Sequence, residues 1–230
     1  KLAPAEIPQI PFSVEVLQRA KENGEWLKLD TDLTGAGEDM NMQGQNTHLR
    51  GRYAKERKGK VLRDEAGWKK NEEFFTEDKP QLRWRLVGKE VIPGTLNENA
   101  VVQTRKIADH LQNTVFAGQE IPAEYAEAIA EFEAQEDEIT ILMDSDWHEC
   151  CRRLAALKLN QMCRRLPVEA LSDCQTYFDN NGERLLENTY DRTTRLSSLG
   201  VLVDVGLADS AGALVLGWYP NCAPPVGGVV

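Results

Sequence analysis

The spacing of apolar positions predicts a helical body across the second half of the chain. Apolar residues recur at helical spacing from Asn97 to Gly118 and again after Pro122, the pattern of helices with one buried face. A third helix is expected to start near Asp144 or Asp146 and to end at Pro167. Two more helices are expected at Val168–Phe178 and Glu183–Leu199.

Alternation of apolar and polar residues predicts short strands on either side of this body. Glu25–Asp30 and Gln81–Val87 alternate along their length, and Ser13 is placed to cap a short helix before the first of them. Near the C-terminus, Val201–Val205 and Ala213–Trp218 read as a hairpin. The predicted fold class is therefore α+β and predominantly helical, with an irregular N-terminal region at 1–96 and a helical body with a C-terminal hairpin and extended tail at 97–230.

The last third of the chain has the order helix, helix, helix, two-stranded wing. At the level of the fold this order resembles a winged helix, with Glu183–Leu199 in the position of the recognition helix. A DNA reader needs Lys or Arg along that helix to meet phosphates. Here its basic residues are offset by acids, which favours a protein-contact module over a DNA reader: Arg184, Arg192 and Arg195 stand among Glu183, Glu187 and Asp191.

Charge is sorted into two blocks along the chain. Nine Lys or Arg stand against three acids between Arg50 and Lys70, whereas Ile107–Cys151 holds twelve Asp or Glu and no Lys or Arg. Like charges repel within a compact fold unless opposite charge lies nearby. Each block is therefore expected either to face the other or to face a partner.

The two blocks supply the candidate partner-binding residues. The basic candidates are Arg50, Arg52, Lys55, Arg57, Lys58 and Lys60; the acidic candidates are Glu124, Glu127, Glu131 and Glu133. Glycines at 51 and 59 argue against a stable long helix through the basic segment. Nucleic acid is an alternative partner for 50–70, where Tyr53 and Trp68 are interleaved with the basic residues, although a net charge of −10 disfavours it.

Two patterns suggest metal chemistry, and each has a simpler structural interpretation. The apolar run 139–143 leads into Asp144 and Asp146, a spacing that could hold Mg²⁺ or Mn²⁺ in a transferase, but Asp before an apolar helix is also an ordinary N-cap. His148 and Cys151 share a helix face and could bind zinc, but without a Cys-x-x-Cys pair buried thiols are the better interpretation. No nucleophile motif, phosphate loop or dinucleotide fingerprint is present, so no catalytic residue, metal or cofactor is assigned.

The five irregularly spaced cysteines indicate a reduced, intracellular chain, and no apolar run is long enough for a membrane span. The leading hypothesis is a non-catalytic subunit of a larger macromolecular assembly, which docks on other protein subunits through its basic and acidic blocks and its extended arms. A nucleic-acid-associated winged-helix protein and a metal-dependent transferase are the alternatives.

Overall fold

The computed structural model describes residues 6–33, 37–63, 67–222 and 226–227, and the chain folds into two compact units. The first consists of 1–90, 166–188 and 206–214; the second consists of 91–165, 189–205 and 215–230. The chain therefore passes between them several times. The division at residue 96 stays a prediction.

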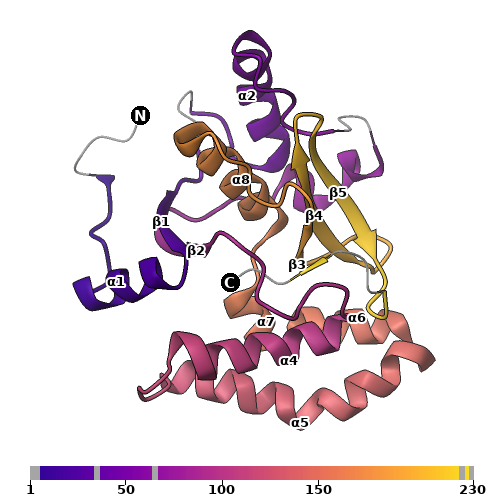
Figure 1. Cartoon of the computed structure of the whole chain (residues 1–230). Coiled ribbons are helices and arrows are strands. Elements are labelled where there is room, and N and C mark those ends of the chain that lie inside the picture. The colour runs from indigo at the N-terminus through magenta and orange to yellow at the C-terminus, as the bar shows by residue number, and fades with distance from the viewer. Residues whose placement is uncertain (1–5, 34–36, 64–66, 223–225, 228–230) are drawn as a thin grey trace. The chain divides into compact units, whose positions relative to one another are not determined.

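The first unit is built on a two-stranded ribbon and a helix from far along the chain (Figure 1). β1 (Glu25–Asp30) and β2 (Arg83–Gly88) pair antiparallel, with Glu25 opposite Gly88 and Asp30 opposite Arg83. Both strands were predicted, as was α1 (Val14–Glu22), whose N-cap Ser13 accepts a hydrogen bond from the backbone of Val16. The other helices of this unit are η2 (Trp68–Asn71), α3 (Glu73–Thr76), α2 (Met42–Lys55) and α8 (Pro167–Asn181).

A buried ionic cluster joins the ribbon to α8. The Nζ of Lys28 lies 2.6 Å from Oδ1 of Asp173, 2.8 Å from Oγ of Ser172 and 3.0 Å from Oδ1 of Asp30. Arg85 on β2 donates to Asp30 and, over 2.9 Å, to Asp173. The polar face of β2, which carries its arginines, therefore faces the carboxylates of α8.

The basic segment is helical as far as Lys55, so the prediction that its glycines prevent a long helix was wrong at Gly51, whereas no helix continues through Gly59. α2 runs from Met42 to Lys55, capped by Asn41, and passes through Gly51, where an added methyl group would meet open space. Tertiary packing outweighs the low helix propensity of glycine, because Tyr53 on this helix is buried against Phe178 of α8. Gly59 lies beyond the helix, with φ of +91° and the backbone of Ser210 against it.

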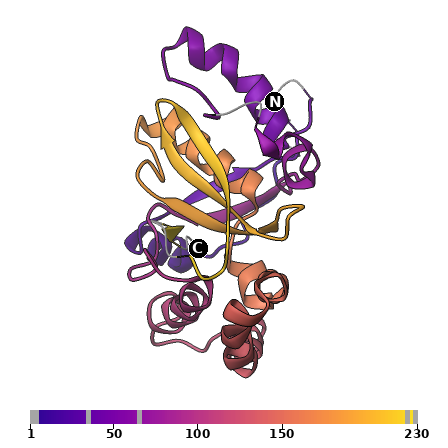
Figure 2. The same ribbon diagram turned by 90° about the vertical axis from the view of Figure 1, so that its right-hand side faces the viewer.

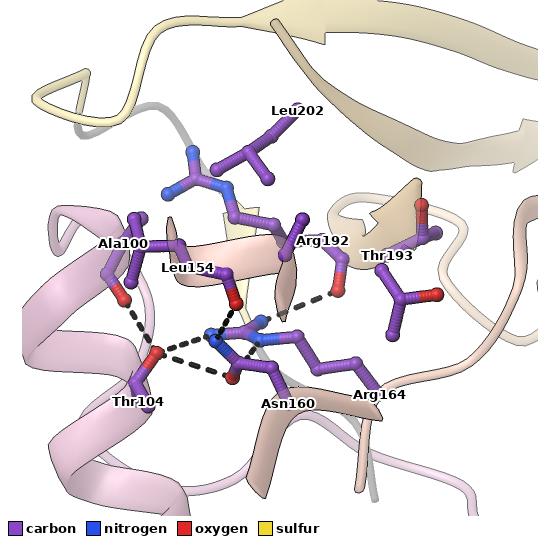
Figure 3. A pocket seen from close by; sticks show the side chains of 10 residues that line it. Ala100, Thr104, Leu154, Asn160, Arg164, Arg192, Thr193 and Leu202 are labelled. Atoms are coloured by element: carbon purple, nitrogen blue, oxygen red, sulfur yellow. Dashed lines mark hydrogen bonds between the residues drawn. The ribbon is translucent and has the colours of Figure 1, made fainter. Parts of the chain in front are cut away.

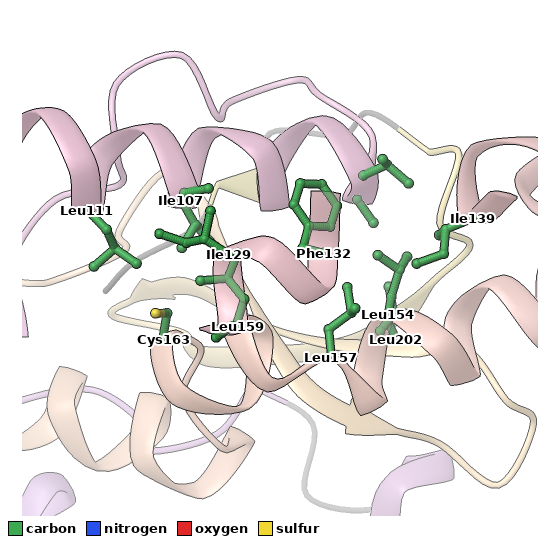
Figure 4. Close-up of a cluster of buried hydrophobic side chains, with 14 of the residues drawn as sticks. Ile107, Leu111, Ile129, Phe132, Ile139, Leu154, Leu157, Leu159, Cys163 and Leu202 are labelled. Carbon is green, nitrogen blue, oxygen red and sulfur yellow. The ribbon is translucent and has the colours of Figure 1, made fainter. Parts of the chain in front are cut away.

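The second unit is mainly helical. It contains α4 (Ala100–His110), a π-helical turn η3 (Leu111–Val115), α5 (Ala123–Ser145), α6 (Trp147–Ala156) and α7 (Lys158–Cys163). Figure 4 shows the core that these helices share, where Ile107, Phe132 and Leu154 are almost completely buried. The predicted helices were found, but Asn99 rather than Asn97 caps α4, and the third helix breaks at Leu157 into α6 and α7.

The C-terminal sheet has the strand order β5-β4-β3-β6, from β3 (Tyr190–Leu196), β4 (Leu202–Asp209), β5 (Gly212–Trp218) and β6 (Val226–Gly227). The predicted hairpin is β4–β5. The predicted helix Glu183–Leu199 was wrong, because β3 occupies its centre and Thr193 bonds through Oγ1 to the backbone of Val203 on β4. The structure describes this segment throughout and shows no helix there, so the resemblance to a winged helix is lost. The predicted fold class is confirmed as mixed α+β.

Gly51→Ala and Gly59→Ala should change stability in opposite directions. Alanine at position 51 should raise the free energy of unfolding by about 0.5–1 kcal/mol, because the site is helical and open. Alanine at position 59 should lower it by about 1–3 kcal/mol, because φ is positive and the Ser210 backbone is in the way. Urea unfolding of the two variants beside the unmodified protein measures both effects, and equal effects would contradict the observed backbone.

Lys28→Met should lower the free energy of unfolding by about 3 kcal/mol or more, since it leaves two buried carboxylates without their ammonium partner. Lys21→Met, at an exposed site on α1, is the matched control and should change it by less than about 0.5 kcal/mol. Equal values in urea unfolding would mean that the cluster around Lys28 does not support the fold.

Candidate functional site

The six basic candidates lie together at the C-terminal end of α2 and in the loop that follows it. We call Arg50, Arg52, Lys55, Arg57, Lys58 and Lys60 the basic surface. In both views of the chain this end of α2 forms the outer edge of its unit (Figure 2). The side chains of Lys55, Arg57 and Lys60 are exposed and have no ion-pair partner among the described residues.

Part of the basic surface is neutralised by α8. Arg52 donates to Asp179, and Nζ of Lys58 lies 2.8 Å from the same carboxylate. Although burial acts in the opposite direction, these two cations hold the pKa of Asp179 below its usual value. Arg184 also supports the loop, because it donates a hydrogen bond of 2.7 Å to the carbonyl oxygen of Lys58 and stacks on Phe178. The fold thus fixes this surface in place while leaving three of its charges free.

The acidic candidates lie on α5, and the structure divides them into two pairs. We call Glu124, Glu127, Glu131 and Glu133 the acidic surface. Glu133 accepts from Arg105 on α4 at 3.1 Å, and Glu131 accepts from the backbone N–H of Lys158 at 3.0 Å. Glu124 and Glu127 are exposed, and their side chains make no hydrogen bond or ion pair with any residue that the structure describes.

Arginines from neighbouring helices balance the acidic block further along α5. Arg105 also binds Glu136, and Nη1 of Arg153 on α6 lies 2.7 Å from Glu138. The sequence shows no cation within 107–151, but helix packing brings in Arg105, which precedes that stretch, and Arg153, which follows it. Segregation along the sequence is therefore only partly preserved in space.

The Asp-x-Asp pattern serves a helix junction. Asp144 lies in the last turn of α5, and Asp146 is the N-cap of α6, where its Oδ1 accepts from the backbone N–H of Glu149 at 3.1 Å. The run 139–143 is helical and not a strand. The capping interpretation is confirmed for Asp146, and no group of three or more metal-ligating side chains occurs within the described part of the chain.

The cysteines are mostly core residues. Cys150, Cys151, Cys163 and Cys174 are buried and unbridged, and burial raises the pKa of the Cys150 thiol to about 12. His148 is exposed and stacks on Trp147, so it does not meet the buried Cys151 as a ligand pair would. The prediction of buried thiols is confirmed for these four cysteines.

A pocket in the second unit contains functional groups that the sequence pattern did not reveal (Figure 3). Arg164 is buried there and donates from Nε to Asn160 at 2.8 Å, from Nη1 to the carbonyl oxygen of Arg192 at 3.2 Å and from Nη2 to Thr104 at 3.4 Å. Burial, and after it the charge of Arg192, lowers the pKa of Arg164 to about 10.

Arg192 lies in the same pocket and is 1% exposed. Its Nε lies 3.3 Å from Oδ1 of Asp204, whereas neither terminal nitrogen has a hydrogen-bond partner in the described part of the chain. Burial raises the pKa of Asp204 to about 7, although Arg192 acts in the opposite direction. The sequence pattern places Arg192 on the predicted helix Glu183–Leu199 and Arg164 near the end of the helix before Pro167, so only knowledge of β3 could have brought them together.

No protein-family model, curated protein or solved structure matches this chain. None of the helices in the described ranges combines the length and apolarity that crossing a bilayer requires.

The raised pKa of Asp204 predicts that this group makes the fold less stable as pH rises from about 4 to 7. In that window the folded carboxyl keeps a proton that the unfolded chain has released, so raising the pH favours unfolding by about 1.4 kcal/mol for each unit by which the folded pKa is raised. Urea unfolding at a series of pH values should show this fall, and Asp204→Asn should lack it.

Asp137→Asn, at an exposed carboxylate of the same unit, is the control and should keep the profile of the unmodified protein. If Asp204→Asn also keeps that profile, the buried carboxyl does not titrate in this range.

Proposed function

We propose that this protein is a non-catalytic subunit of a macromolecular assembly, docking on neighbouring protein subunits through its basic and acidic surfaces. The observation that carries the proposal is a set of three exposed cations, Lys55, Arg57 and Lys60, which form no ion pair with the described residues, in a chain of net charge −10. An acidic partner surface is the complement that this arrangement fits.

The way the basic surface is built supports a docking role. Arg52 and Lys58 are held by Asp179, and Arg184 holds the loop by donating a hydrogen bond to the backbone carbonyl of Lys58. The free cations are therefore presented on a supported helix end and loop. Presenting charges in a fixed arrangement lowers the entropy that docking must remove.

The acidic surface supports the same role in the other unit. Glu124 and Glu127 stand one helical turn apart near the start of α5 and form no ion pair with the described residues, whereas Glu133, Glu136 and Glu138 further along the helix are paired with arginines. Complementary charge of this kind contributes orientation and association rate more than affinity. A basic surface on a neighbouring subunit would meet it.

The exposed apolar residues of the N-terminal arm are consistent with docking. Ile7 and Ile10 are 43% and 45% exposed, and the carbonyl oxygen of Pro8 accepts from Nε1 of Trp84 at 2.8 Å. The arm is thus held at one point while its larger apolar side chains face solvent, where a neighbour could cover them. Residues 223–225 and 228–230 of the C-terminal arm lie outside the described residues.

The test is binding after charge reversal. Tagged protein would be purified from its native source with its stoichiometric partner, and the affinity for that partner would be remeasured with recombinant proteins. Lys55→Glu combined with Lys60→Glu should weaken binding by about tenfold or more, mainly through a slower association rate, and the difference should shrink at high salt.

The matched control is Lys21→Glu combined with Lys89→Glu, two exposed lysines of the same unit outside the basic surface. It changes the net charge equally and should leave binding nearly unchanged. The proposal fails if the native protein runs as a free monomer, or if both double variants weaken binding equally. Binding of single-stranded nucleic acid with a steep salt dependence, lost only in the first variant, would replace the protein partner by nucleic acid.

A further inference from the structure

The β1–β2 ribbon of the first unit buries its polar face and leaves its apolar face half-exposed. Lys28 and Asp30 on the polar face are 4% and 1% exposed, because they belong to the ionic cluster against α8. The register places Arg85 opposite Lys28, and successive residues of a strand point to opposite faces. The residues between these polar positions therefore form the other face of the ribbon.

That other face is apolar and incompletely covered. The register sets Leu27 opposite Leu86 and Leu29 opposite Trp84, and all four side chains are intermediate between buried and exposed. Leu82 continues the alternation one residue before β2 and is 38% exposed. An apolar sheet face is ordinarily covered by a second layer of structure. Because every side chain of this face keeps contact with water, that layer is incomplete.

The neighbouring segments of the chain do not close the face. The N-terminal arm meets it at Trp84, whose Nε1 donates to the carbonyl oxygen of Pro8, but the arm leaves its own Ile7 and Ile10 in water. Within α1, which is described in full and leads into β1, only Ala20 is buried. Figure 1 shows the ribbon with α8 on one side and the N-terminal arm on the other. Apolar surface thus remains for another molecule to cover.

One charged group stands on this apolar face. Glu25 begins β1 two residues before Leu27, so it lies on the same side of the strand, and its partner in the register is Gly88, which has no side chain. The Glu25 carboxylate is half-buried and forms no ion pair or hydrogen bond with the described residues. Burial raises the pKa of this carboxyl above its usual value. A Lys or Arg of a partner would compensate its charge.

The dimensions of the ribbon match one helix. On the polar face a single helix, α8, contacts both strands, through Lys28 of β1 and Arg85 of β2. Paired strands lie about 4.8 Å apart, and a helix with its side chains is about 10 Å wide. Six residues of strand span about 20 Å, which corresponds to about four helical turns. One amphipathic helix therefore fits the apolar face in width and length.

We propose that the apolar face of the ribbon docks an amphipathic helix of a partner protein, whose apolar side covers the leucines and Trp84 and whose Lys or Arg pairs with Glu25. The site adds a third contact to the docking function proposed above, and it uses neither the basic surface nor the acidic surface. A second copy of this chain is a poorer occupant, because two chains of net charge −10 repel each other.

The probes are two synthetic helical peptides of about 15 residues, each with leucines on one face. One carries lysines on its other face, and the second carries glutamates in their place. Each peptide is titrated into the full chain, and amide hydrogen exchange locates the binding site. The leucine–lysine peptide should bind saturably and slow exchange in β1 and β2. The leucine–glutamate peptide should bind at least about tenfold more weakly.

Two matched pairs of variants test the contacts. Glu25→Gln should weaken binding of the leucine–lysine peptide by about fivefold, and Glu22→Gln, which removes an exposed carboxylate three residues away, should leave it unchanged. Leu82→Asn should weaken binding by about fivefold or more, because an apolar contact is lost. Leu33→Asn, at a leucine of the same unit that is 45% exposed and outside the ribbon, should not weaken it.

Three results would overturn the proposal: no saturable binding, equal binding of the two peptides, or slowed exchange that is confined to α5. Dimerisation that slows exchange in the ribbon without peptide would also overturn it, since a second copy would then be the occupant. None of these measurements changes Lys55 or Lys60, so the outcome here and the outcome of the charge-reversal test of the proposed function are decided separately.

Discussion

The ionic cluster of Lys28, Asp30, Arg85 and Asp173 is the contact on which the first unit depends. It joins two strands that are more than fifty residues apart to a helix that the chain supplies much later. A buried ion pair is a weak source of net stability, because desolvation offsets most of the attraction. Its effect is specificity: an unpaired member would be strongly destabilising, so α8 is held in one position on the ribbon.

That position has consequences for the basic surface. Residues of α8 bury Tyr53 and bind Arg52 and Lys58, so the same helix that completes the ionic cluster also supports the end of α2. A segment that appears irregular and glycine-rich in the sequence thereby becomes an ordered platform. The contact of Lys28 with Asp173 spans 145 positions, and no local pattern could have indicated it.

Short-range sequence patterns predicted most of the helices and strands. The predictions failed where pairing with a distant segment determines the structure. Ser13, Pro122 and Asp146 mark helix starts in both sequence and structure, because an N-cap acts within a single turn. The segment 183–199 contains residues that suit a helix, yet Tyr190–Leu196 is a strand because β4 supplies its partner. The six basic candidates are neighbours in the sequence, so the sequence pattern identified them as a group. The pocket with Arg164 and Arg192 forms only through the fold, so the pattern did not identify it.

The two kinds of positive charge in this protein differ in what they can do. Lys55 and Lys60 are solvated, so each contributes little affinity by itself and acts by steering a charged partner. Arg164 and Arg192 are removed from water, so their charges act in a low dielectric, where each hydrogen bond and each nearby carboxylate counts for more than a surface contact. Charge sorting along the sequence draws attention to the first kind. The second kind comes from one arginine on a strand and one between two helices, which no pattern along the sequence brings together.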